Sequence, residues 1–385
     1  MSRPWRVAYA TGSRADYGIV RRWLDLLEGD PRIELSILAT ASMLDLRYGR
    51  PVDLVRADGH RVAAEVELPL GSSSASDVAS SMGAALVGFD RYLSGNPVDL
   101  MVVLGDRYEM LSAAEAAAMR RVPVLHVHGG EATWGNYDEF IRHSITKMAA
   151  YHFTATEGAR KRVVQLGEDP SRVFWLGSLG VENCLLDEVS SSMEPPFDGP
   201  YMVVLFHPET ASGADSARQV RVLLDALDYF PSTGFAVIGP NADTGSLAVR
   251  DAMRAWCDGH GNAIYFENLR PEDYHRLLRL SCGLVGNSSS GIIEAPSLGV
   301  RTVNIGDRQA GRERASSVVD VPCTVRAIYN AVGAALEAPA LTEVENPYYR
   351  PHAARSYHET TLQILESLEG DLRRPKEFYD VKFEL

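Results

Sequence analysis

Short runs of aliphatic and β-branched residues alternate with helix-like segments along almost the whole chain. This alternation is typical of a mainly parallel sheet covered on both faces, because parallel strands are joined by crossover helices. In the first half the expected strands are Arg6–Thr11, Glu34–Thr40, Leu100–Leu104, Val122–His128, Tyr151–Ala155 and Val173–Leu176. In the second half they are Tyr201–Phe206, Gly234–Ile238, Ala263–Phe266, Cys282–Gly286 and Arg301–Asn304. The pattern predicts an α/β fold.

The two halves meet at a stretch rich in Ser, Pro and Gly, residues 188–200. Such a composition suits an exposed linker, and the 385 residues of the chain fit two domains of about 150–200 residues better than one core. We expect two doubly wound, Rossmann-like domains over residues 1–187 and 200–365, followed by a tail over residues 366–385. Ligands of such sheets bind at the carboxyl ends of the strands, so we expect a binding cleft between the domains.

Charge and composition argue against several kinds of partner. The formal net charge of −13 disfavours nucleic acid and anionic membrane surfaces, although a small anionic ligand needs only local positive charge. No apolar run approaches the roughly 20 residues that span a bilayer, and the N-terminus enters a strand without a signal peptide. The cysteines have no paired spacing for zinc or disulfides; they are Cys184, Cys257, Cys282 and Cys323. We therefore expect a cytoplasmic, reduced protein.

The most distinctive polar motif is the segment Gly286–Glu294, Gly-Asn-Ser-Ser-Ser-Gly-Ile-Ile-Glu. It follows an expected strand and begins an expected helix over residues 291–298. Free backbone N–H groups at a helix start, with hydroxyls beside them, suit a diphosphate, and a carboxylate one turn later can reach a ribose. The alternative is a Ser-rich cap of an ordinary helix. The nucleotide interpretation rests on Ser288, Ser289, Ser290, Gly291 and Glu294.

Two polar clusters of the first half also follow expected strands. The turn at residues 12–18 lacks the spacing G-x-G-x-x-G, but its Arg14 suits a phosphate, because a guanidinium can bind two oxygens at once. Asp106 and Arg107 follow Leu100–Leu104. Such a pair is often a structural salt bridge, but its place at the carboxyl end of a strand favours catalysis.

The densest cluster gathers imidazoles, carboxylates and a guanidinium: His126, His128, Glu131, Asp138, Glu139, Arg142 and His143. Residues two apart on a strand share a face, so His126 and His128 should point the same way. These groups could hold a metal, but no third ligand has a regular spacing, and we expect neither metal nor cofactor. Proton donors and acceptors are the better interpretation, with His126 and Arg142 bracing the Gly-Gly turn.

Three polar positions of the second half follow strands as well. His207 comes after Tyr201–Phe206, Asn241 lies in a turn after Gly234–Ile238, and Arg308 follows Arg301–Asn304. Taken singly, each of these residues could be an ordinary solvated loop residue. Because all three are expected near the serine-rich motif, a binding site for a diphosphate is the favoured interpretation.

In these blocks the chain resembles the hydrolysing UDP-N-acetylglucosamine 2-epimerases of bacterial sialic acid synthesis. The resemblance covers nearly the whole chain and rests on residues 12–18, 105–109, 126–131, 137–148, 207–210, 241–245, 286–294 and 304–312. The form Asn-Tyr-Asp-Glu at residues 136–139 is most similar to the enzymes that serve polysialic acid capsules. The chain departs from some members at His128, where they have Glu, and at Ala41–Met43, where many have Gly-Met-His.

The resemblance implies a GT-B fold with UDP in the cleft and no metal, and a C-terminal helix that returns to the first domain. It also implies a homodimer or homotetramer. By position, UDP is held by Arg14, Asn241, Ser288, Ser289, Glu294 and Arg308. Catalysis falls to Asp106, Asp138 and His207, with Glu131 and His128 as further candidates and with Arg107 and Glu139 on the sugar.

The implied reaction turns UDP-N-acetylglucosamine and water into N-acetylmannosamine and UDP through a 2-acetamidoglucal. Its alternatives within the family are a UDP-2,4-diacetamido-2,4,6-trideoxyhexose donor and a non-hydrolysing epimerase. Outside it stand a GT-B glycosyltransferase, a metal hydrolase and a nucleotide-sugar sensor. The sequence shows no basic or apolar run that would serve an acceptor substrate of a glycosyltransferase.

Overall fold

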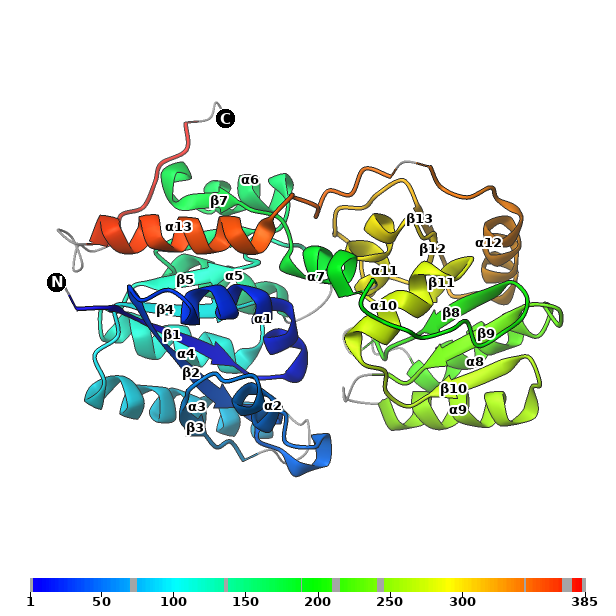
Figure 1. Ribbon diagram of the computed structural model, residues 1–385, viewed down its shortest axis with the longest axis horizontal. Coiled ribbons are helices and arrows are strands. Elements are labelled where there is room, and N and C mark those ends of the chain that lie inside the picture. Colours follow the sequence, from blue (N-terminus) through cyan, green and yellow to red (C-terminus); the bar gives the residue numbers. More distant parts are fainter. Residues whose placement is uncertain are drawn as a thin grey trace. The chain divides into compact units, whose positions relative to one another are not determined.

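The chain folds into two compact units. The structure is a computed structural model that describes residues 3–69, 75–134, 138–187, 189–209, 215–240, 246–342, 344–368 and 376–382. The first unit comprises Met1–Glu131, Tyr137–Leu179 and Arg350–Leu385, and the second comprises Ala132–Asn136 and Gly180–Tyr349. The elements of each unit are labelled in Figure 1.

The first unit contains a seven-stranded sheet in the order β3-β2-β1-β4-β5-β6-β7. Its strands are β1 (Trp5–Thr11), β2 (Ile33–Thr40), β3 (Val62–Val66), β4 (Leu100–Leu104), β5 (Val124–Val127), β6 (Tyr151–Thr154) and β7 (Val173–Trp175). All neighbouring pairs are parallel. The strands expected from the sequence are present, and the edge strand β3 is an addition to them.

Helices cover both faces of this sheet (Figure 1). They are α1 (Arg14–Glu28), α2 (Val52–Ala57), α3 (Ala75–Gly95), α4 (Tyr108–Met119), α5 (Asp138–Met148), α6 (Glu157–Gln165) and α13 (Ala353–Ser367). Successive side chains of a strand point to opposite faces. Val7 and Tyr9 of β1 therefore pack with α1 and α13, whereas Ala8 and Ala10 pack with α3, α4 and α5.

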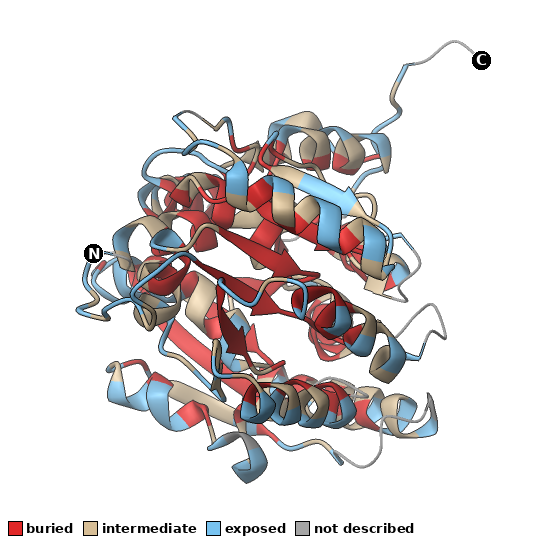
Figure 2. Cartoon of the chain, turned by 90° about the vertical axis from the view of Figure 1, so that its right-hand side faces the viewer, coloured by how far each residue is buried: buried red, intermediate tan, exposed pale blue. Residues whose placement is uncertain are grey.

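The second unit contains a six-stranded parallel sheet in the order β10-β9-β8-β11-β12-β13. Its strands are β8 (Tyr201–Leu205), β9 (Gly234–Ile238), β10 (Ala263–Phe266), β11 (Gly283–Gly286), β12 (Thr302–Ile305) and β13 (Val318–Val321). Its helices are α8 (Ser216–Leu227), α9 (Ser246–Gly259), α10 (Pro271–Arg279), α11 (Ser290–Ile293) and α12 (Val325–Glu337), and α7 (Leu179–Asp187) leads into it. Figure 2 shows the buried residues concentrated along the strands, with exposed residues on the outer helix faces.

The chain returns to the first unit at Arg350, earlier than the boundary at residue 366 expected from the sequence. The reason lies in α13, whose Tyr357 is fully buried with Trp23 and Phe153. The Tyr357 ring lies 5.4 Å from Trp23 and 4.9 Å from Phe153, and its hydroxyl donates to the carbonyl oxygen of Gly177 at 2.9 Å. The helix is thus part of the first hydrophobic core.

Residues 376–382 also pack on the first unit. The ammonium group of Lys376 donates to the carbonyl oxygens of Thr146 at 3.2 Å and Lys147 at 2.8 Å, at the end of α5. It also lies 2.6 Å from Glu168 Oε2. Burial lowers the pKa of Lys376 to about 8, although Glu168 opposes this shift. The tail therefore holds the C-terminal end of α5.

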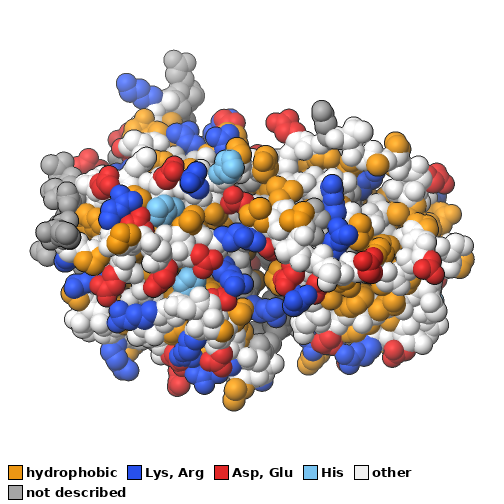
Figure 3. Space-filling model, viewed as in Figure 1, with side chains coloured by type: hydrophobic (Ala, Val, Ile, Leu, Met, Phe, Trp, Pro, Cys, Tyr) orange, Lys and Arg blue, Asp and Glu red, His pale blue; other side chains and the backbone are white. Residues whose placement is uncertain are grey.

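Both units are doubly wound parallel sheets, so the Rossmann-like prediction is confirmed. Among the described residues, no helix is both long and apolar enough to cross a membrane. On the face shown in Figure 3, side chains of both charge signs are interspersed, so the negative charge excess is not gathered there into one patch.

Candidate active site

The polar residues of the first unit follow three neighbouring strands, β1, β4 and β5. Arg14 begins α1 after β1, and Asp106 and Arg107 lie between β4 and α4. The turn that ends in Glu131 follows β5, and Asp138 begins α5. Because the carboxyl ends of parallel strands share one edge of a sheet, the structure brings these positions to the same edge.

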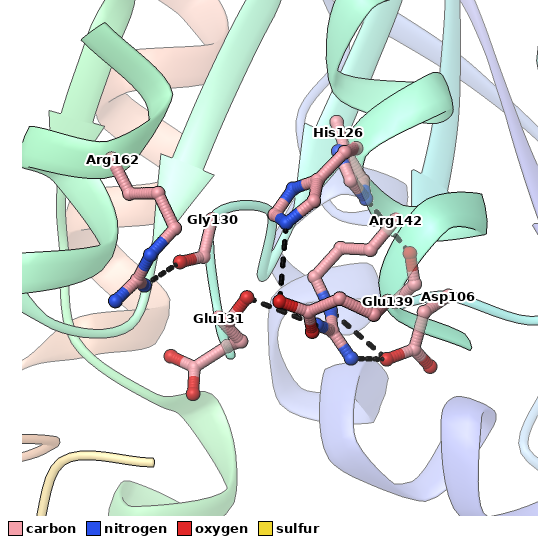
Figure 4. A network of polar contacts seen from close by, with 9 residues as sticks. Asp106, His126, Gly130, Glu131, Glu139, Arg142 and Arg162 are labelled. Carbon is pink, nitrogen blue, oxygen red and sulfur yellow. Dashed lines mark hydrogen bonds and ion pairs between the residues drawn. The ribbon is translucent and has the colours of Figure 1, made fainter. Parts of the chain in front are cut away.

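Arg142 of α5 is the centre of the network drawn in Figure 4, and its side chain is only 1% exposed. Its guanidinium binds Asp106 Oδ2, through Nε at 3.0 Å and through a shorter contact from Nη2. Nη1 donates to Glu139 Oε2 at 2.7 Å and to the carbonyl oxygen of Glu131 at 2.9 Å. Because an unpaired buried charge is costly, Arg142 fixes the carboxylates of Asp106 and Glu139 and the backbone of Glu131.

His126 supports the same network from β5. Its Nε2 lies 2.8 Å from the carbonyl oxygen of Gly105, which can only accept, so Nε2 carries the proton. Nδ1 then accepts from the hydroxyl of Thr146 at 3.1 Å. Burial lowers the pKa of His126 to about 3, so the ring is neutral near pH 7. With both nitrogens occupied, His126 has a structural role, but its hydrogen bond holds Gly105, the residue before Asp106, and not the Gly-Gly turn expected from the sequence.

The expectation that His126 and His128 share a strand face is wrong. Strand β5 ends at Val127, and His128 adopts a left-handed conformation with φ of +61°. Its backbone N–H donates to the carbonyl oxygen of Phe153 at 2.7 Å. Gly130 follows with φ of +77°, and a Cβ atom there would collide with the carbonyl oxygen of Ala159. The turn needs glycine at that position, and it leads the chain to Glu131.

The sequence predicts that Arg14 binds the nucleotide and that Arg107 contacts the sugar. Arg14 is exposed at the first position of α1, where the Ser13 hydroxyl accepts from the backbone N–H of Asp16 at 3.2 Å. Arg107 pairs with the fully buried carboxylate of Glu109. Burial raises the pKa of Asp16 to about 6, although the charge of Arg107 opposes this shift. The side chain of Arg107 keeps 41% of its surface exposed, so a ligand can reach it.

In the second unit, Asn287 joins the ends of β8 and β11 to the loop after β12. Its side-chain oxygen accepts from the backbone N–H of His207 at 2.7 Å, and its side-chain nitrogen donates to the carbonyl oxygen of His207 at 2.8 Å. The carbonyl oxygen of Asn287 accepts from Arg308 at 3.1 Å and from Gln309 at 3.0 Å. Asn287 is fully buried, and it therefore fixes two predicted site residues, His207 and Arg308.

The expected helix over residues 291–298 is broken. Helix α11 ends at Ile293, and residues Ala295–Leu298 form a 3₁₀ turn that contains Pro296. Proline at this position cannot donate to the preceding turn, which explains the break. A single helical turn has only a small dipole, so backbone N–H groups, hydroxyls and Arg308 remain the groups that could bind phosphate.

Glu294 directly follows α11 and lies one helical turn after Ser290, as the sequence predicts. Its Oε2 accepts from the hydroxyl of Ser290 at 2.6 Å, and the backbone N–H of Ser290 donates to the hydroxyl of Ser288 at 3.3 Å. Burial alone would raise the pKa of Glu294, but the imidazole of His275 and the Ser290 hydroxyl hold it below its usual value. Glu294 is therefore an ionised hydrogen-bond acceptor.

His207 is 3% exposed after β8. Burial lowers its pKa to about 3, and the nearby charge of Arg308 acts in the same direction. The ring is therefore neutral near pH 7. Asn241 lies outside the described residues. In the described part of the chain, no three His, Cys, Asp or Glu side chains are grouped as metal ligands.

Two supporting residues, Asn287 and His275, were not predicted from the sequence. Asn287 lies inside the serine-rich motif, and its position directly after a strand was a usable signal. His275 is an interior position of α10, and nothing local distinguishes it from a buried core histidine. Only the packing of α10 against Glu294 shows its role.

Comparisons with known proteins agree with this fold. Residues 25–361 match the family model described as UDP-N-acetylglucosamine 2-epimerase. The "Polysialic acid biosynthesis protein P7" of Escherichia coli is 41% identical over 98% of this chain and 97% of its own length. The "UDP-N,N'-diacetylbacillosamine 2-epimerase (hydrolyzing)" of Legionella pneumophila is 34% identical over 87% of this chain and 90% of its own.

Among solved structures, the UDP-GlcNAc 2-epimerase of Neisseria meningitidis bound to UDP-GlcNAc has a TM-score of 0.78 at 17% identity. The similarity covers 93% of this chain and all of the other. At that identity it shows the fold, which is GT-B. The chain belongs to the UDP-N-acetylglucosamine 2-epimerase family.

Proposed function

We propose that this protein is a hydrolysing UDP-N-acetylglucosamine 2-epimerase. It converts UDP-N-acetylglucosamine and water into N-acetylmannosamine and UDP, the first step of sialic acid synthesis. The proposal rests on the different groups at the strand ends of the two units. Carboxylates fixed by Arg142 follow the strands of the first unit, and groups suited to bind phosphate and ribose follow the strands of the second unit. The 41% identity to a polysialic acid biosynthesis protein supports the pathway.

The proposed reaction begins with elimination. The C1–O bond to UDP breaks while a base removes the proton from C2, which leaves a 2-acetamidoglucal. Water then adds at C1, and an acid delivers a proton to C2 from the opposite face. The carbanion-like C2 would not form without a good leaving group, so stabilisation of the departing diphosphate is the main demand on the site.

UDP is the ligand we assign to the second unit and to Arg14. Arg14 and Arg308 meet the charge that develops on the diphosphate, together with backbone N–H groups of the serine-rich turn. Glu294 accepts from the ribose hydroxyls. The remaining UDP contacts in this proposal come from Asn241, Ser288, Ser289, Ser290 and Gly291.

Two groups on opposite faces of the sugar ring are needed at C2. We assign this pair to Asp106 with either Asp138 or Glu131, and we assign assistance to the departing phosphate to the neutral imidazole of His207. Further proposed sugar contacts are made by Arg107 and Glu139, and His128 stays a further catalytic candidate. The bond from Arg142 keeps Asp106 oriented between turnovers.

A second candidate reaction applies the same chemistry to a UDP-2,4-diacetamido-2,4,6-trideoxyhexose. It is favoured by the 34% identity to the Legionella enzyme named for UDP-N,N'-diacetylbacillosamine. The two donors differ at C4, where an acetamido group replaces the hydroxyl, and at C6, where a methyl group replaces the hydroxymethyl group. A direct competition between the donors separates the two proposals.

The test is proton NMR of the purified protein with each donor in D₂O, with and without EDTA. N-acetylmannosamine deuterated at C2, with free UDP and no effect of EDTA, is the expected result. UDP-N-acetylmannosamine as product would assign the protein to the non-hydrolysing reaction instead. Turnover of the diacetamido donor alone would establish the second candidate, and turnover of neither would refute both.

A further inference from the structure

His275 of α10 is buried between two carboxylates of the second unit. The residue is 6% exposed, and its Nδ1 lies 3.6 Å from Asp187 Oδ2, at the end of α7. Its Nε2 lies 3.7 Å from Glu294 Oε2, the same oxygen that accepts from Ser290. Three elements, α7, α10 and α11, therefore meet at one imidazole ring.

The neighbouring residue Tyr274 adds a second connection to Glu294. Its hydroxyl lies 2.8 Å from the hydroxyl of Ser290, which in turn donates to Glu294 Oε2 at 2.6 Å. Two consecutive residues of α10 thus act on a single carboxylate oxygen, one through Ser290 and one through its own charge. Rotation of the Glu294 carboxylate would break both interactions.

The two oxygens of Glu294 are consequently unequal. Oε2 is occupied by Ser290 and His275, whereas Oε1 has no hydrogen-bonding partner within the described ranges. The side chain keeps 21% of its surface exposed. An ionised oxygen that is held in place and open on one side suits hydroxyl groups of a ligand, because a charged acceptor forms the stronger hydrogen bonds.

The charge state of the trio follows from its surroundings. Burial would lower the pKa of His275, but Asp187 and Glu294 outweigh it and raise the pKa to about 9. Burial also raises the pKa of Tyr274, so its hydroxyl stays protonated near pH 9. Near pH 7 an imidazolium therefore lies between two carboxylates, and its positive charge keeps Glu294 ionised.

We propose that His275 is a positioning residue for nucleotide recognition, which holds the Glu294 carboxylate where it accepts from the ribose hydroxyls. His275 does not touch the nucleotide in this role, and Asp187 and Tyr274 hold the assembly together. The inference rests on the proposed binding of UDP at Glu294. In this proposal Glu294 distinguishes ribose from deoxyribose, and His275, which lies outside the binding surface, keeps its carboxylate in position to do so.

The experiment measures the dissociation constants of UDP and 2′-deoxy-UDP by calorimetry on the full chain. Wild type should bind UDP about 10–100-fold more tightly, the range of one hydrogen bond to a charged group. His275→Phe should reduce this preference below about threefold, with the KM of the substrate raised and kcat nearly unchanged. Tyr274→Phe should partly reduce the preference for UDP over 2′-deoxy-UDP. Because this substitution removes only a hydroxyl, it tests the inference even if His275→Phe fails to fold.

A matched control is His60→Gln in the first unit. His60 is also buried beside two carboxylates, 3.1 Å from Asp25 and 3.9 Å from Glu28, but neither of these belongs to a predicted site residue. It should leave the preference for UDP unchanged. A pH series gives a second readout, because loss of the His275 proton near pH 9 should lower the preference in wild type and not in His275→Phe. The ratio of two ligands cancels titration of the uracil ring that they share.

The outcomes separate the inference from the function on which it rests. If wild type prefers UDP and His275→Phe keeps that preference, the positioning role is refuted while the nucleotide site stands. If wild type binds both nucleotides equally, Glu294 does not read the ribose, and this part of the proposed function fails. A preference that falls in His275→Phe and Tyr274→Phe but not in His60→Gln establishes the positioning role.

Discussion

Tyr357→Phe tests whether α13 completes the core of the first unit. The substitution keeps the ring between Trp23 and Phe153 and removes only the hydroxyl that donates to Gly177 at 2.9 Å. The carbonyl oxygen of Gly177 then loses a buried partner, which costs about 1–3 kcal/mol of unfolding free energy. With a urea dependence of about 2 kcal/mol per molar, the midpoint should fall by roughly 0.5–1.5 M.

Urea unfolding followed by tryptophan fluorescence gives the midpoint, and hydrogen exchange with mass spectrometry shows where protection is lost. Loss is expected in peptides of β1, β6 and α13, while β8–β11 keep their protection. Tyr349→Phe is the control, since that side chain is 45% exposed and lies in the second unit. A midpoint shift below about 0.2 M, or a loss of protection in the second unit, would refute the reasoning.

Three further predictions concern the site and the tail. Asp106→Asn should lower turnover by about 10²–10⁴-fold, because asparagine cannot transfer the proton at C2. The protein should stay folded, since the asparagine side chain can still accept a hydrogen bond from Arg142. Near-full turnover in a kinetic assay would show that Asp106 is not part of the mechanism. The buried rings of His126 and His207 have pKa values lowered to about 3, so the stability that they contribute is present above pH 6.5 and lost as pH falls toward 3. As pH falls from 7 to 4, the unfolding free energy should decrease by up to about 1.4 kcal/mol per pH unit for each ring, and the urea midpoint should fall with it. A urea midpoint that does not change with pH would contradict the burial of these rings as neutral groups. Lys376→Met should expose the C-terminal turn of α5 to faster hydrogen exchange, and unchanged exchange there would show that the tail does not hold it.

The central strands could be predicted from the sequence because they are apolar on both faces. Strand β1 was expected over Arg6–Thr11 and found over Trp5–Thr11. The edge strands β3 and β13 were missed. Their residues are mostly half-buried or exposed, so a run such as Val62–Val66 lacks the continuous apolar pattern of a buried strand. Helix α12 was also missed, although Thr324 caps it and its amphipathic period was readable.

The positions of the strand ends predicted which polar residues lie at the carboxyl edge of each sheet. They did not predict which side chains hydrogen-bond to these residues. Arg142, which binds Asp106, comes from α5, and His275, which lies beside Glu294, comes from α10, so both contacts depend on the packing of separate elements. The broken helix after Ser290 shows the opposite case. Pro296 was a local signal, and the expectation of a continuous helix gave it too little weight.

The late position of α13 in the chain has a consequence for biosynthesis. Tyr357 bonds to Gly177 across 180 residues, and the second unit is synthesised almost entirely within that interval. At about 5–20 residues per second, the ribosome needs roughly 10–35 s to reach the helix. During this time Trp23 and Phe153 lack their aromatic partner, and by its end the second unit has all of its own strands. A nascent chain stalled before residue 353 would therefore carry one finished unit and one with an open aromatic surface, the kind of surface that chaperones bind.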